Sequence, residues 1–535
     1  MAASAYPEGS IAYVNGNIYT VDKAQPRAGG FVVSPQGVFA AVGSSEEIKA
    51  NAQAQGLVIR DLGGTFIMPG IHDSHVHSFV SGLHLVGDIL MDLATTNTGD
   101  QMVAKLKNGC GGCSHHAGPS DWIIGVLLEI ENYDRSILDE EWPDRPVFIH
   151  AYGGHMKYLN TAALEKAGFD VQNEPDAPSS IYQRRPDGSL TGTIGGQAAL
   201  GRASMAIPKP SIPHLKKALK RAMKELHRNG VTSCQEAATN SVMLKVLNEL
   251  DIDGQLKVDY STHILYKNEW LSGEILADPE ELIKSAERYL SKHVNTRFVK
   301  FMMDGGPGGP AVLQQAGLDK DGKPDMANIL QPDLPELLSR CDQRGMTCKV
   351  HAMGEGGARL ALDAVAAARK QNPNGPIHEV AHSCMVHKDD LGRFKDLNVT
   401  AEMSPAMFFA NGFDYVKDQI VYDFPGFKAK NTRMTIGSDW AFGMFLPLLP
   451  SIAHLVDIIG AESLLEMLTI NGATSVGKDK VSGSISVGKK ANFIAVDRDL
   501  TKGDFANAKI TNTWFEGEMV YEMATEYVER PALGA

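Results

Sequence analysis

Short apolar runs of strand length alternate with amphipathic stretches of helix length through the middle of the chain. Alternation of this kind is typical of β/α folds, in which helices cover a mostly parallel sheet. Eight runs share the pattern: TFIMPGI, GVTSCQEA, VDYSTHILY, FVKFMMDGG, TCKVHAMG, HEVAHSC, NVTAEMS and MTIGSDW. Helical candidates between them include residues 212–230, 278–293 and 334–345. Because a (β/α)8 TIM barrel requires eight parallel strands, the sequence predicts this α/β fold.

A long stretch between the first and second runs does not fit the repeat. It contains one strong strand candidate, RPVFIHAYGGH at residues 145–155, which the count of eight leaves out. We therefore expect residues 85–210 to form an inserted, cap-like segment that follows the first barrel strand and covers the barrel mouth.

Both ends of the chain show a pattern of short strand-like runs and tight turns that the middle lacks. Short β-rich runs broken by Asn-Gly, Gln-Gly and Glu-Gly turns occur near residues 11–43 and again near residues 483–522. Neither end alone supplies enough strands for a stable sheet. We therefore predict a composite β-sandwich domain of residues 1–66 and 477–535, with the barrel domain, residues 67–476, inserted between them.

The bulk composition narrows the class of function. The chain has 535 residues, a net charge of −13 and no long Lys/Arg run, which argues against a nucleic-acid partner. No stretch approaches about 18 uninterrupted apolar residues, and the start lacks the pattern of a secretory signal. We therefore expect a cytoplasmic protein with a small-molecule substrate and no membrane partner, and a homo-oligomer stays open.

Six cysteines in a chain of this length do not make a disulfide framework, and they indicate a reducing compartment. Cys110 and Cys113 stand in CGGCSHH, which looks like half of a zinc knuckle. A structural zinc site usually needs a second ligand pair at a defined distance. We therefore favour a surface loop here, with a structural metal or a redox pair as the alternative.

The segment MPGIHDSHVHSFV, residues 68–80, places three histidines and an aspartate directly after a hydrophobic run. We expect TFIMPGI to be the first barrel strand, with the polar cluster where that strand ends. Residues two apart in a strand point the same way, so His75 and His77 present both imidazoles to one point. Convergent imidazoles are what a metal ion needs, although one such pair alone also fits chance.

Four further candidate ligands lie in later runs of the repeat: Lys300, His351, His382 and Asp439. In a TIM barrel the carboxyl ends of the strands converge on one mouth, where active sites lie. Each residue also has a structural alternative. A strand-end His is often a hydrogen-bonded core residue, Asp in GSD often caps a helix, and a Lys can snorkel out of a sheet. Their occurrence in barrel order favours one metal site.

The order HxH, Lys, His, His, Asp on successive barrel strands resembles the amidohydrolase superfamily. The chain is similar in particular to the third amidohydrolase family, whose members include N-substituted formamide deformylases. The resemblance runs from about residue 11 to 521 through FIMPGIHDSHVH, DRPVFIHAYGGHMKYLNTAALEKAG, PDGSLTG, VKFMMDGG, VHAMGEGGARLALDA, GSDW and GSISVGKKANFIAVDRDL. It implies a TIM barrel with a β-sandwich made from both termini.

The resemblance also implies a metal centre. His75, His77 and Asp439 would bind one Zn²⁺, and His351 and His382 a second, with iron or manganese as alternative metals. Protonated Lys300 has no lone pair for a cation. In many superfamily members the lysine at this position reacts with CO₂ to give a carbamate, whose oxygens bridge two ions in a geometry suited to hydrolysis. Without that carbamate, a single-zinc enzyme is favoured.

The implied activity is hydrolysis of a C–N bond in an amide, formamide or cyclic amide through a metal-activated hydroxide. Asp439 would take the proton of the attacking water and deliver it to the leaving nitrogen. His155, in the GGH of the insertion, would donate to the developing oxyanion, with a helix-capping role as the alternative. Tyr152 is a weaker candidate for the same pocket.

Two other functions stay open. A zinc-dependent deaminase of the same superfamily uses one zinc and a Glu shortly after the fifth-strand His, and Glu355 lies four residues after His351. A non-catalytic metal-binding scaffold is less favoured, because no ligand of the pattern is missing. The chain also departs from the family, since Gly195 and Gly196 stand where relatives usually carry an acidic residue. A substrate contact usually made there is not expected to carry over.

Overall fold

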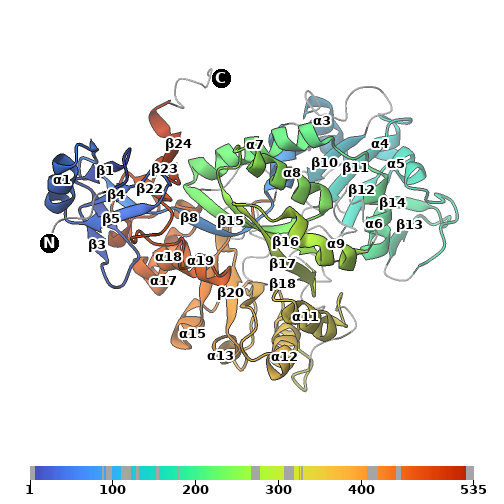
Figure 1. The fold of residues 1–535 in the computed structure, drawn as a ribbon. Coiled ribbons are helices and arrows are strands. Elements are labelled where there is room, and N and C mark those ends of the chain that lie inside the picture. Colours follow the sequence, from blue (N-terminus) through green and yellow to red (C-terminus); the bar gives the residue numbers. More distant parts are fainter. Residues whose placement is uncertain are drawn as a thin grey trace.

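The computed structural model of the chain describes residues 6–86, 90–91, 99–109, 122–127, 132–151, 156–177, 180–266, 278–305, 318–323, 326, 329–406, 420–441 and 447–525. Figure 1 shows three regions: sheets built from both ends of the chain, a central barrel, and a further sheet on the opposite side of the barrel. The barrel strands and the helices around them form an extended apolar core.

Eight parallel strands form the central barrel, in the order in which they occur along the chain. They are β8 (Ile71–Val76), β15 (Val231–Thr239), β16 (Asp259–Leu265), β17 (Val294–Met302), β18 (Thr347–Ala352), β19 (His378–His382), β20 (Val399–Met403) and β21 (Met434–Ile436). A parallel bridge between Val76 and Trp440 closes the sheet, and the Asp439 amide donates to the His75 carbonyl at 2.8 Å. The predicted α/β barrel is confirmed.

The two ends of the chain build two sheets with a shared core, as their similar pattern predicts. One sheet has the order β5-β4-β1-β6 and the other β24-β23-β22-β7-β2-β3. Their strands are β1 (Ile11–Val14), β2 (Asn17–Tyr19), β3 (Arg27–Ala28), β4 (Gly30–Val33), β5 (Phe39–Gly43), β6 (Val58–Asp61), β7 (Phe66–Pro69), β22 (Phe493–Val496), β23 (Ile510–Phe515) and β24 (Glu518–Glu522). The ring centroid of Phe493 lies 4.9 Å from that of Phe31 and 4.6 Å from that of Trp514. Burial of these aromatic rings joins the first and last segments.

The first barrel strand differs from the prediction. The run TFIMP supplies β7, which pairs with β2 and β22 in the sheet of the chain ends and is not part of the barrel. The barrel begins at Ile71, so the HxH pair lies within and directly after β8. Gly70 separates the two strands. Its amide donates to the Asn492 carbonyl, and a side chain at this position would overlap Thr232 of β15.

A six-stranded sheet lies between β8 and β15 in the sequence, in the order β13-β14-β12-β11-β10-β9. Its elements are β9 (Leu90–Met91), α3 (Gly99–Gly109), β10 (Ile123–Leu127), α4 (Ser136–Asp139), β11 (Val147–Ala151), β12 (Met156–Leu159), α5 (Thr161–Lys166), β13 (Ile181–Arg184), β14 (Leu190–Gly195) and α6 (Gln197–Ala206). The run RPVFIHA supplies β11, so the predicted insertion after the first barrel strand is confirmed. Val80 and Leu83 of α2 (Ser78–Leu85), the helix after β8, pack against the apolar core of this sheet.

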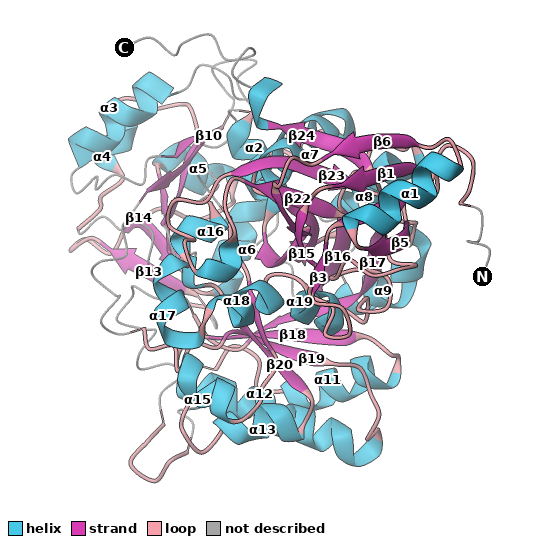
Figure 2. Ribbon diagram, turned by 90° about the vertical axis from the view of Figure 1, so that its left-hand side faces the viewer, coloured by secondary structure: helices cyan, strands magenta, loops and turns pink. Residues whose placement is uncertain are grey.

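Helices cover the outside of the barrel (Figure 2). In α7 (Ile212–Arg228), the Ser211 side chain caps the N-terminus, and Leu215, Leu219 and Leu226 follow at helical spacing and are buried. Further helices are α8 (Ser241–Ile252), α9 (Pro279–Ser285), α11 (Leu334–Gln343), α12 (Glu355–Gln371), α13 (Leu391–Asp396), α15 (Phe424–Ala429), α16 (Leu448–Ser451), α17 (Val456–Ile459), α18 (Ala461–Met467) and α19 (Ile470–Ser475). The helix α1 (Ser45–Ala54) packs instead on β1 and β4 of the chain-end sheets. Thus α7 and α11 confirm two of the helical predictions, whereas the predicted helix at 278–293 is α-helical only in α9 and continues as a 3-10 turn, Ala286–Tyr289.

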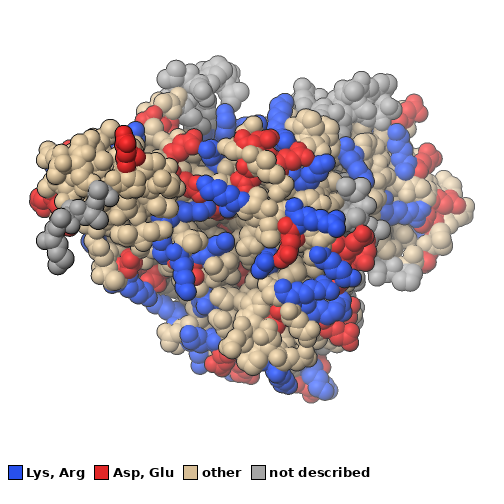
Figure 3. Space-filling view, in the orientation of Figure 1, with Lys and Arg blue, Asp and Glu red and all other residues tan. Residues whose placement is uncertain are grey.

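Two surface properties bear on partners. Within the described residues, every helix is too short or too polar to span a bilayer. On the face drawn in Figure 3, basic and acidic side chains are intermixed across the surface of the barrel and of the sheets beside it. Mixed charge of this kind does not create the one-signed field that steers a highly charged polymer.

Candidate metal centre

Side chains from the first and last barrel strands meet at the carboxyl end of the barrel. His75 lies near the end of β8, His77 directly after it, and Asp439 three residues beyond β21. The Nε2 atoms of His75 and His77 lie 3.6 Å and 3.5 Å from Asp439 Oδ1. These distances are too long for strong hydrogen bonds. The three groups therefore surround a common point without pairing closely.

His382, at the end of β19, joins this group. Its Nδ1 lies 3.9 Å from Asp439 Oδ2, and its ring centroid lies 4.8 Å from that of His75. The backbone here is strained, because His382, Ser383 and Asp439 have φ values of 70°, 44° and 50°. Non-glycine residues rarely adopt this left-handed region, each instance costs on the order of 1–3 kcal/mol, and such residues cluster at functional sites.

These groups fit a divalent metal ion. One ligand atom each from His75, His382 and Asp439 lies within 4.8 Å of the others. Among the described residues, the buried Nδ1 of His382 has no hydrogen-bond partner, so a polar ring atom faces the Asp439 carboxylate unpaired. Imidazole nitrogen and carboxylate oxygen are donors that zinc binds readily.

The electrostatics favour the metal-binding forms of these side chains. Burial lowers the pKa of His382 to about 3, and burial together with Lys300 lowers the pKa of His75 well below its usual value, so both rings are neutral at pH 7. Burial alone would raise the pKa of Asp439, but the attraction of the neighbouring His77 ring and of the Lys300 charge holds it below its usual range. Neutral imidazole and ionised carboxylate are the forms that bind cations.

Lys300 lies on β17, and 3% of its surface is exposed. Burial and Lys349, its register partner on β18, lower the pKa of the Lys300 amine to about 7. A substantial share of the amine is therefore uncharged at neutral pH. The uncharged amine carries the lone pair that reaction with CO₂ requires, which the ammonium lacks. This environment suits the predicted carbamate.

His351, on β18, lies beside His382, with 4.6 Å between the ring centroids. Its Nε2 lies 3.0 Å from the Gly305 carbonyl oxygen and 3.4 Å from Asp304 Oδ1. Because a carbonyl oxygen only accepts, Nε2 carries the proton and the lone pair of that tautomer is on Nδ1. Asp304 also accepts from the Met353 amide at 2.9 Å, which fixes the turn after β18.

Comparison with known proteins assigns the family. The sequence profile of the amidohydrolase family matches residues 58–521. The chain belongs to the amidohydrolase family. It is a metal-dependent hydrolase that acts on carbon–nitrogen bonds.

Similar proteins cover this amidohydrolase along nearly its whole length. The N-substituted formamide deformylase of Arthrobacter pascens is 24% identical over 96% of this chain and 98% of its own length. The putative amidohydrolase YtcJ of Bacillus subtilis (strain 168) is 24% identical over 95% of this chain and 98% of its own. The crystal structure of an uncharacterized metal-dependent hydrolase from Pyrococcus horikoshii OT3 matches with a TM-score of 0.69 at 21% identity, covering 93% of this chain and 99% of that one.

Some predicted features of the amidohydrolase lie outside the described residues: His155, Tyr152 and the CGGCSHH loop with Cys110 and Cys113. The remaining ones can be placed. Gly195 ends β14, and Gly196 directly precedes α6. Glu355 is the first residue of α12 and is half-buried.

One residue at the amidohydrolase site is absent from the predicted set. Glu402, on β20, is fully buried, and its Oε2 accepts a hydrogen bond from His75 Nδ1 at 2.7 Å. Burial raises the pKa of this carboxyl to about 7. The only signal in the sequence is a single acidic residue inside the apolar run NVTAEMS. Strand alternation does not reveal which partner such a residue meets across the barrel.

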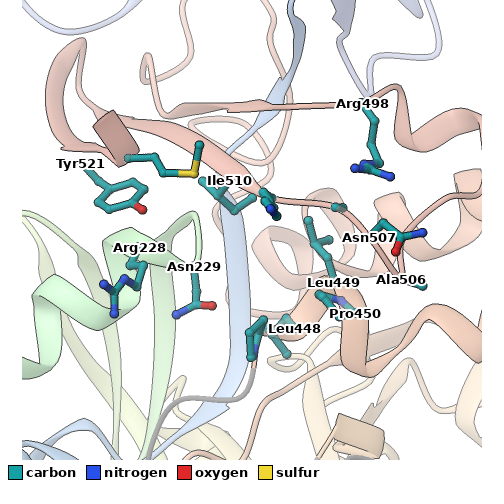
Figure 4. Close-up of a pocket in the computed structure, with 14 residues that line it drawn as sticks. Arg228, Asn229, Leu448, Leu449, Pro450, Arg498, Ala506, Asn507, Ile510 and Tyr521 are labelled. Atoms are coloured by element: carbon teal, nitrogen blue, oxygen red, sulfur yellow. The ribbon is translucent and has the colours of Figure 1, made fainter. Parts of the chain in front are cut away.

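A surface hollow of about 750 Å³ lies at the other end of the amidohydrolase barrel (Figure 4). Arg228 and Asn229 line it together with Leu449 of α16, Arg498 and Tyr521 of β24. Because Arg228 and Asn229 precede β15, the hollow lies at the amino ends of the barrel strands. Active sites of this fold lie at the carboxyl ends, so the histidine cluster, and not this hollow, marks the candidate site.

Proposed function

We propose that this amidohydrolase cleaves the carbon–nitrogen bond of an amide, a formamide or a cyclic amide with water. The products are a carboxylic acid and an amine, which remain joined when the substrate is cyclic. The proposal rests on the convergence of His75, His382 and Asp439 at the carboxyl end of the barrel, with one donor atom each within 4.8 Å. The relative from Arthrobacter pascens is named for formamide deformylation, which supports a formamide among these substrates.

We assign the metal centre to six side chains. His75, His77 and Asp439 would hold one Zn²⁺, His351 and His382 would hold a second, and Lys300, as a CO₂-derived carbamate, would supply ligand oxygens. Iron or manganese is the alternative metal. When bound, such an ion lowers the pKa of a water molecule and polarises a carbonyl oxygen.

The side chains of the site then move protons and stabilise charge. The Asp439 carboxylate, within 3.6 Å of both Nε2 atoms of the HxH pair, takes a proton from the attacking water. As the C–N bond breaks and the new C–O bond remains, Asp439 delivers this proton to the leaving nitrogen. We assign the oxyanion donor to His155 and propose that residues 85–210 act as a cap over the barrel mouth.

A zinc-dependent deaminase of the same superfamily is the second candidate. The donor atoms of His75, His382 and Asp439 form one compact group suited to a single ion, and this observation favours a one-metal enzyme. Glu355, at the start of α12, would then serve as the acid–base group. Such an enzyme releases ammonia from an amino-substituted ring, whereas the first candidate releases an amine or opens a ring.

A substrate screen with the zinc-loaded protein tests the proposal. N-formyl amines, N-acyl amines and cyclic amides are incubated with the enzyme, and amine release or ring opening is measured. We expect turnover of at least one class, and a rate lower by about 10³-fold in His382→Ala. The control His214→Ala, on the outer helix α7, should keep the rate. Ammonia release from amino-substituted rings without amide turnover would support the deaminase, and inactivity toward every class would contradict both.

A further inference from the structure

Glu402 contacts two of the proposed metal ligands without being one of them. Its Oε2 accepts from His75 Nδ1 at 2.7 Å and from the His382 backbone amide at 3.3 Å. Its Oε1 accepts from Ser404 Oγ at 2.9 Å. One buried carboxylate therefore connects three barrel strands, β8, β19 and β20, at the residues that surround the candidate metal centre.

The contact with His75 decides which ring nitrogen can ligate. An ionised carboxylate only accepts, so beside ionised Glu402 the proton is on Nδ1 and the lone pair of the neutral ring is on Nε2. Nε2 is the atom that lies 3.6 Å from Asp439 Oδ1. Glu402 therefore holds the His75 ring in the tautomer and the orientation that ligation through Nε2 requires.

The contact with His382 acts on the backbone. His382 has a φ of 70°, and its amide N–H is the group that Glu402 accepts. A left-handed residue other than glycine persists only where its surroundings fix it. Glu402 therefore helps to hold the turn that places His382 Nδ1 3.9 Å from Asp439 Oδ2.

The pair of His75 and Glu402 is buried and closely packed. His75 is 1% exposed and Glu402 is 0% exposed, so bulk water does not reach their hydrogen bond. Gly437, directly after β21, packs on them. A methyl group at this position would overlap His75 and stand 2.9 Å from Glu402 Oε1.

We infer that Glu402 is a positioning residue of the metal centre, which fixes His75 as an Nε2 ligand and couples its placement to that of His382. This inference depends on the metal centre of the proposed function, and it does not depend on the proposed substrate class. Carboxylates that accept from metal-bound histidines typically contribute about 10–100-fold in metal affinity. We expect Glu402 to contribute to the metal affinity of the protein in the same range.

Zinc affinity measured by competition with a chromophoric chelator tests this role. We expect Glu402→Ala to bind zinc about 100-fold more weakly than the wild type. Glu402→Gln should lose about 10-fold, because its amide oxygen still accepts from Nδ1 but carries no charge. The matched control is Asp342→Asn, which weakens a buried carboxylate–histidine pair at the start of β19, with Asp342 Oδ2 2.9 Å from His378 Nε2. Its zinc affinity should stay within about twofold of the wild type, because this pair does not touch the ligands.

The visible absorption of the cobalt-loaded protein adds a readout that a purely structural role would leave unchanged. We expect the spectrum of Glu402→Gln to change while its melting curve and that of the wild type agree. If Glu402→Ala does not fold, Glu402→Gln alone decides the question. Wild-type zinc affinity in the folded variants would overturn the inference.

The same experiment separates this inference from the proposed function. If the wild type binds neither zinc nor cobalt, the metal centre is wrong and the role of Glu402 falls with it. If the wild type binds metal, Glu402→Gln weakens that binding, and no amide is turned over, only the proposed substrate class fails.

Discussion

Two clusters of this amidohydrolase combine histidine with carboxylates, and they differ in how completely these groups are paired. One lies where the barrel meets the sheets of the chain ends. There His293 Nδ1 lies 2.6 Å from Asp251 Oδ1, and its Nε2 lies 3.0 Å from Glu516 Oε1. Lys490 Nζ lies 3.1 Å from the same Glu516 oxygen. Both ring nitrogens of His293 therefore have a carboxylate partner.

The cluster at the barrel mouth is paired less closely. His75 Nε2, His77 Nε2 and His382 Nδ1 lie 3.5–3.9 Å from the Asp439 carboxylate, and the close carboxylate partner here is Glu402, 2.7 Å from His75 Nδ1. The pKa shifts of the two clusters also run in opposite directions. Burial lowers the pKa of His382 to about 3, whereas the two carboxylate partners of His293 overcome burial and raise its pKa.

This difference separates an ion-pair network from a set of metal ligands. A charged His293 completes the hydrogen bonding of its carboxylates and stabilises the interface. The neutral rings of His75 and His382 beside the Asp439 carboxylate leave His382 Nδ1 unpaired among the described residues and leave room between the donors, as a cation site requires. The account therefore assigns metal binding to the mouth and structural stabilisation to the interface.

Removal of a mouth histidine should give the largest effect. We expect His75→Ala to lower kcat/KM by at least about 10³-fold, or about 4 kcal/mol, because a ligand nitrogen is lost. Turnover and zinc content per protein measure this. The control is His293→Ala in the other cluster, which should keep both. Full activity and full zinc content in His75→Ala would contradict the assignment of metal binding to the cluster at the barrel mouth.

Replacement of Lys300 tests whether the cluster at the barrel mouth holds two metal ions. Lys300→Ala should lower activity by about 10²-fold and reduce the metal-to-protein ratio from two toward one, because the bridging carbamate is lost. A small carboxylic acid such as acetate should restore part of the activity by occupying the bridge. Lys300→Arg should stay inactive, since guanidinium remains protonated and cannot ligate. A metal-to-protein ratio of one in both the wild type and Lys300→Ala would favour the one-metal deaminase, and a ratio of two in both would contradict the bridging role of Lys300.

The barrel strands were predictable because strands of a barrel covered by helices are buried on both faces and read as apolar runs. The exception is instructive. In β8 the segment IHDSHV is buried throughout although most of its residues are polar, whereas FIMP is apolar and belongs to another sheet. A strand whose polar residues face the barrel interior is not found by a search for apolar runs.

The candidate site was predictable where a ligand ends or follows an apolar run, as His75, His382 and Asp439 do. Glu402 was not, because its partner His75 lies 327 positions away and the pairing exists only in the folded barrel. The same holds for the His293 network, in which Glu516 lies 223 positions from its histidine.

Loss of His293 should affect stability and leave catalysis unchanged. We expect His293→Ala to lower the free energy of unfolding by about 2 kcal/mol at pH 6, because two largely buried carboxylates lose a partner. Their side chains are 2% exposed in Asp251 and 15% in Glu516. Urea unfolding measures the change. The control Lys23→Ala breaks an ion pair whose lysine is 89% exposed and should have little effect.

The smallest effect is a dependence of this stabilisation on pH. Asp251 and Glu516 raise the pKa of His293 above its ordinary value of 6.5. A histidine with a raised folded-state pKa contributes fully below its unfolded pKa, and the contribution disappears as the pH rises through the folded-state value. The difference in Tm between wild type and His293→Ala should therefore be larger at pH 6 than at pH 9. A constant difference would mean that His293 acts by packing against Phe515, whose ring centroid is 5.1 Å away.

Locating the metal tests the central claim most directly. Crystals of the zinc-loaded protein, measured on both sides of the zinc absorption edge, reveal bound ions as anomalous difference peaks. The account predicts a peak at the barrel mouth with the ring nitrogens of the HxH pair and an Asp439 oxygen about 2.0–2.2 Å away, and none beside His293. It also predicts a planar group extending from Lys300 Nζ. A mouth without a peak, above all if zinc is found at the His293 cluster instead, would contradict it.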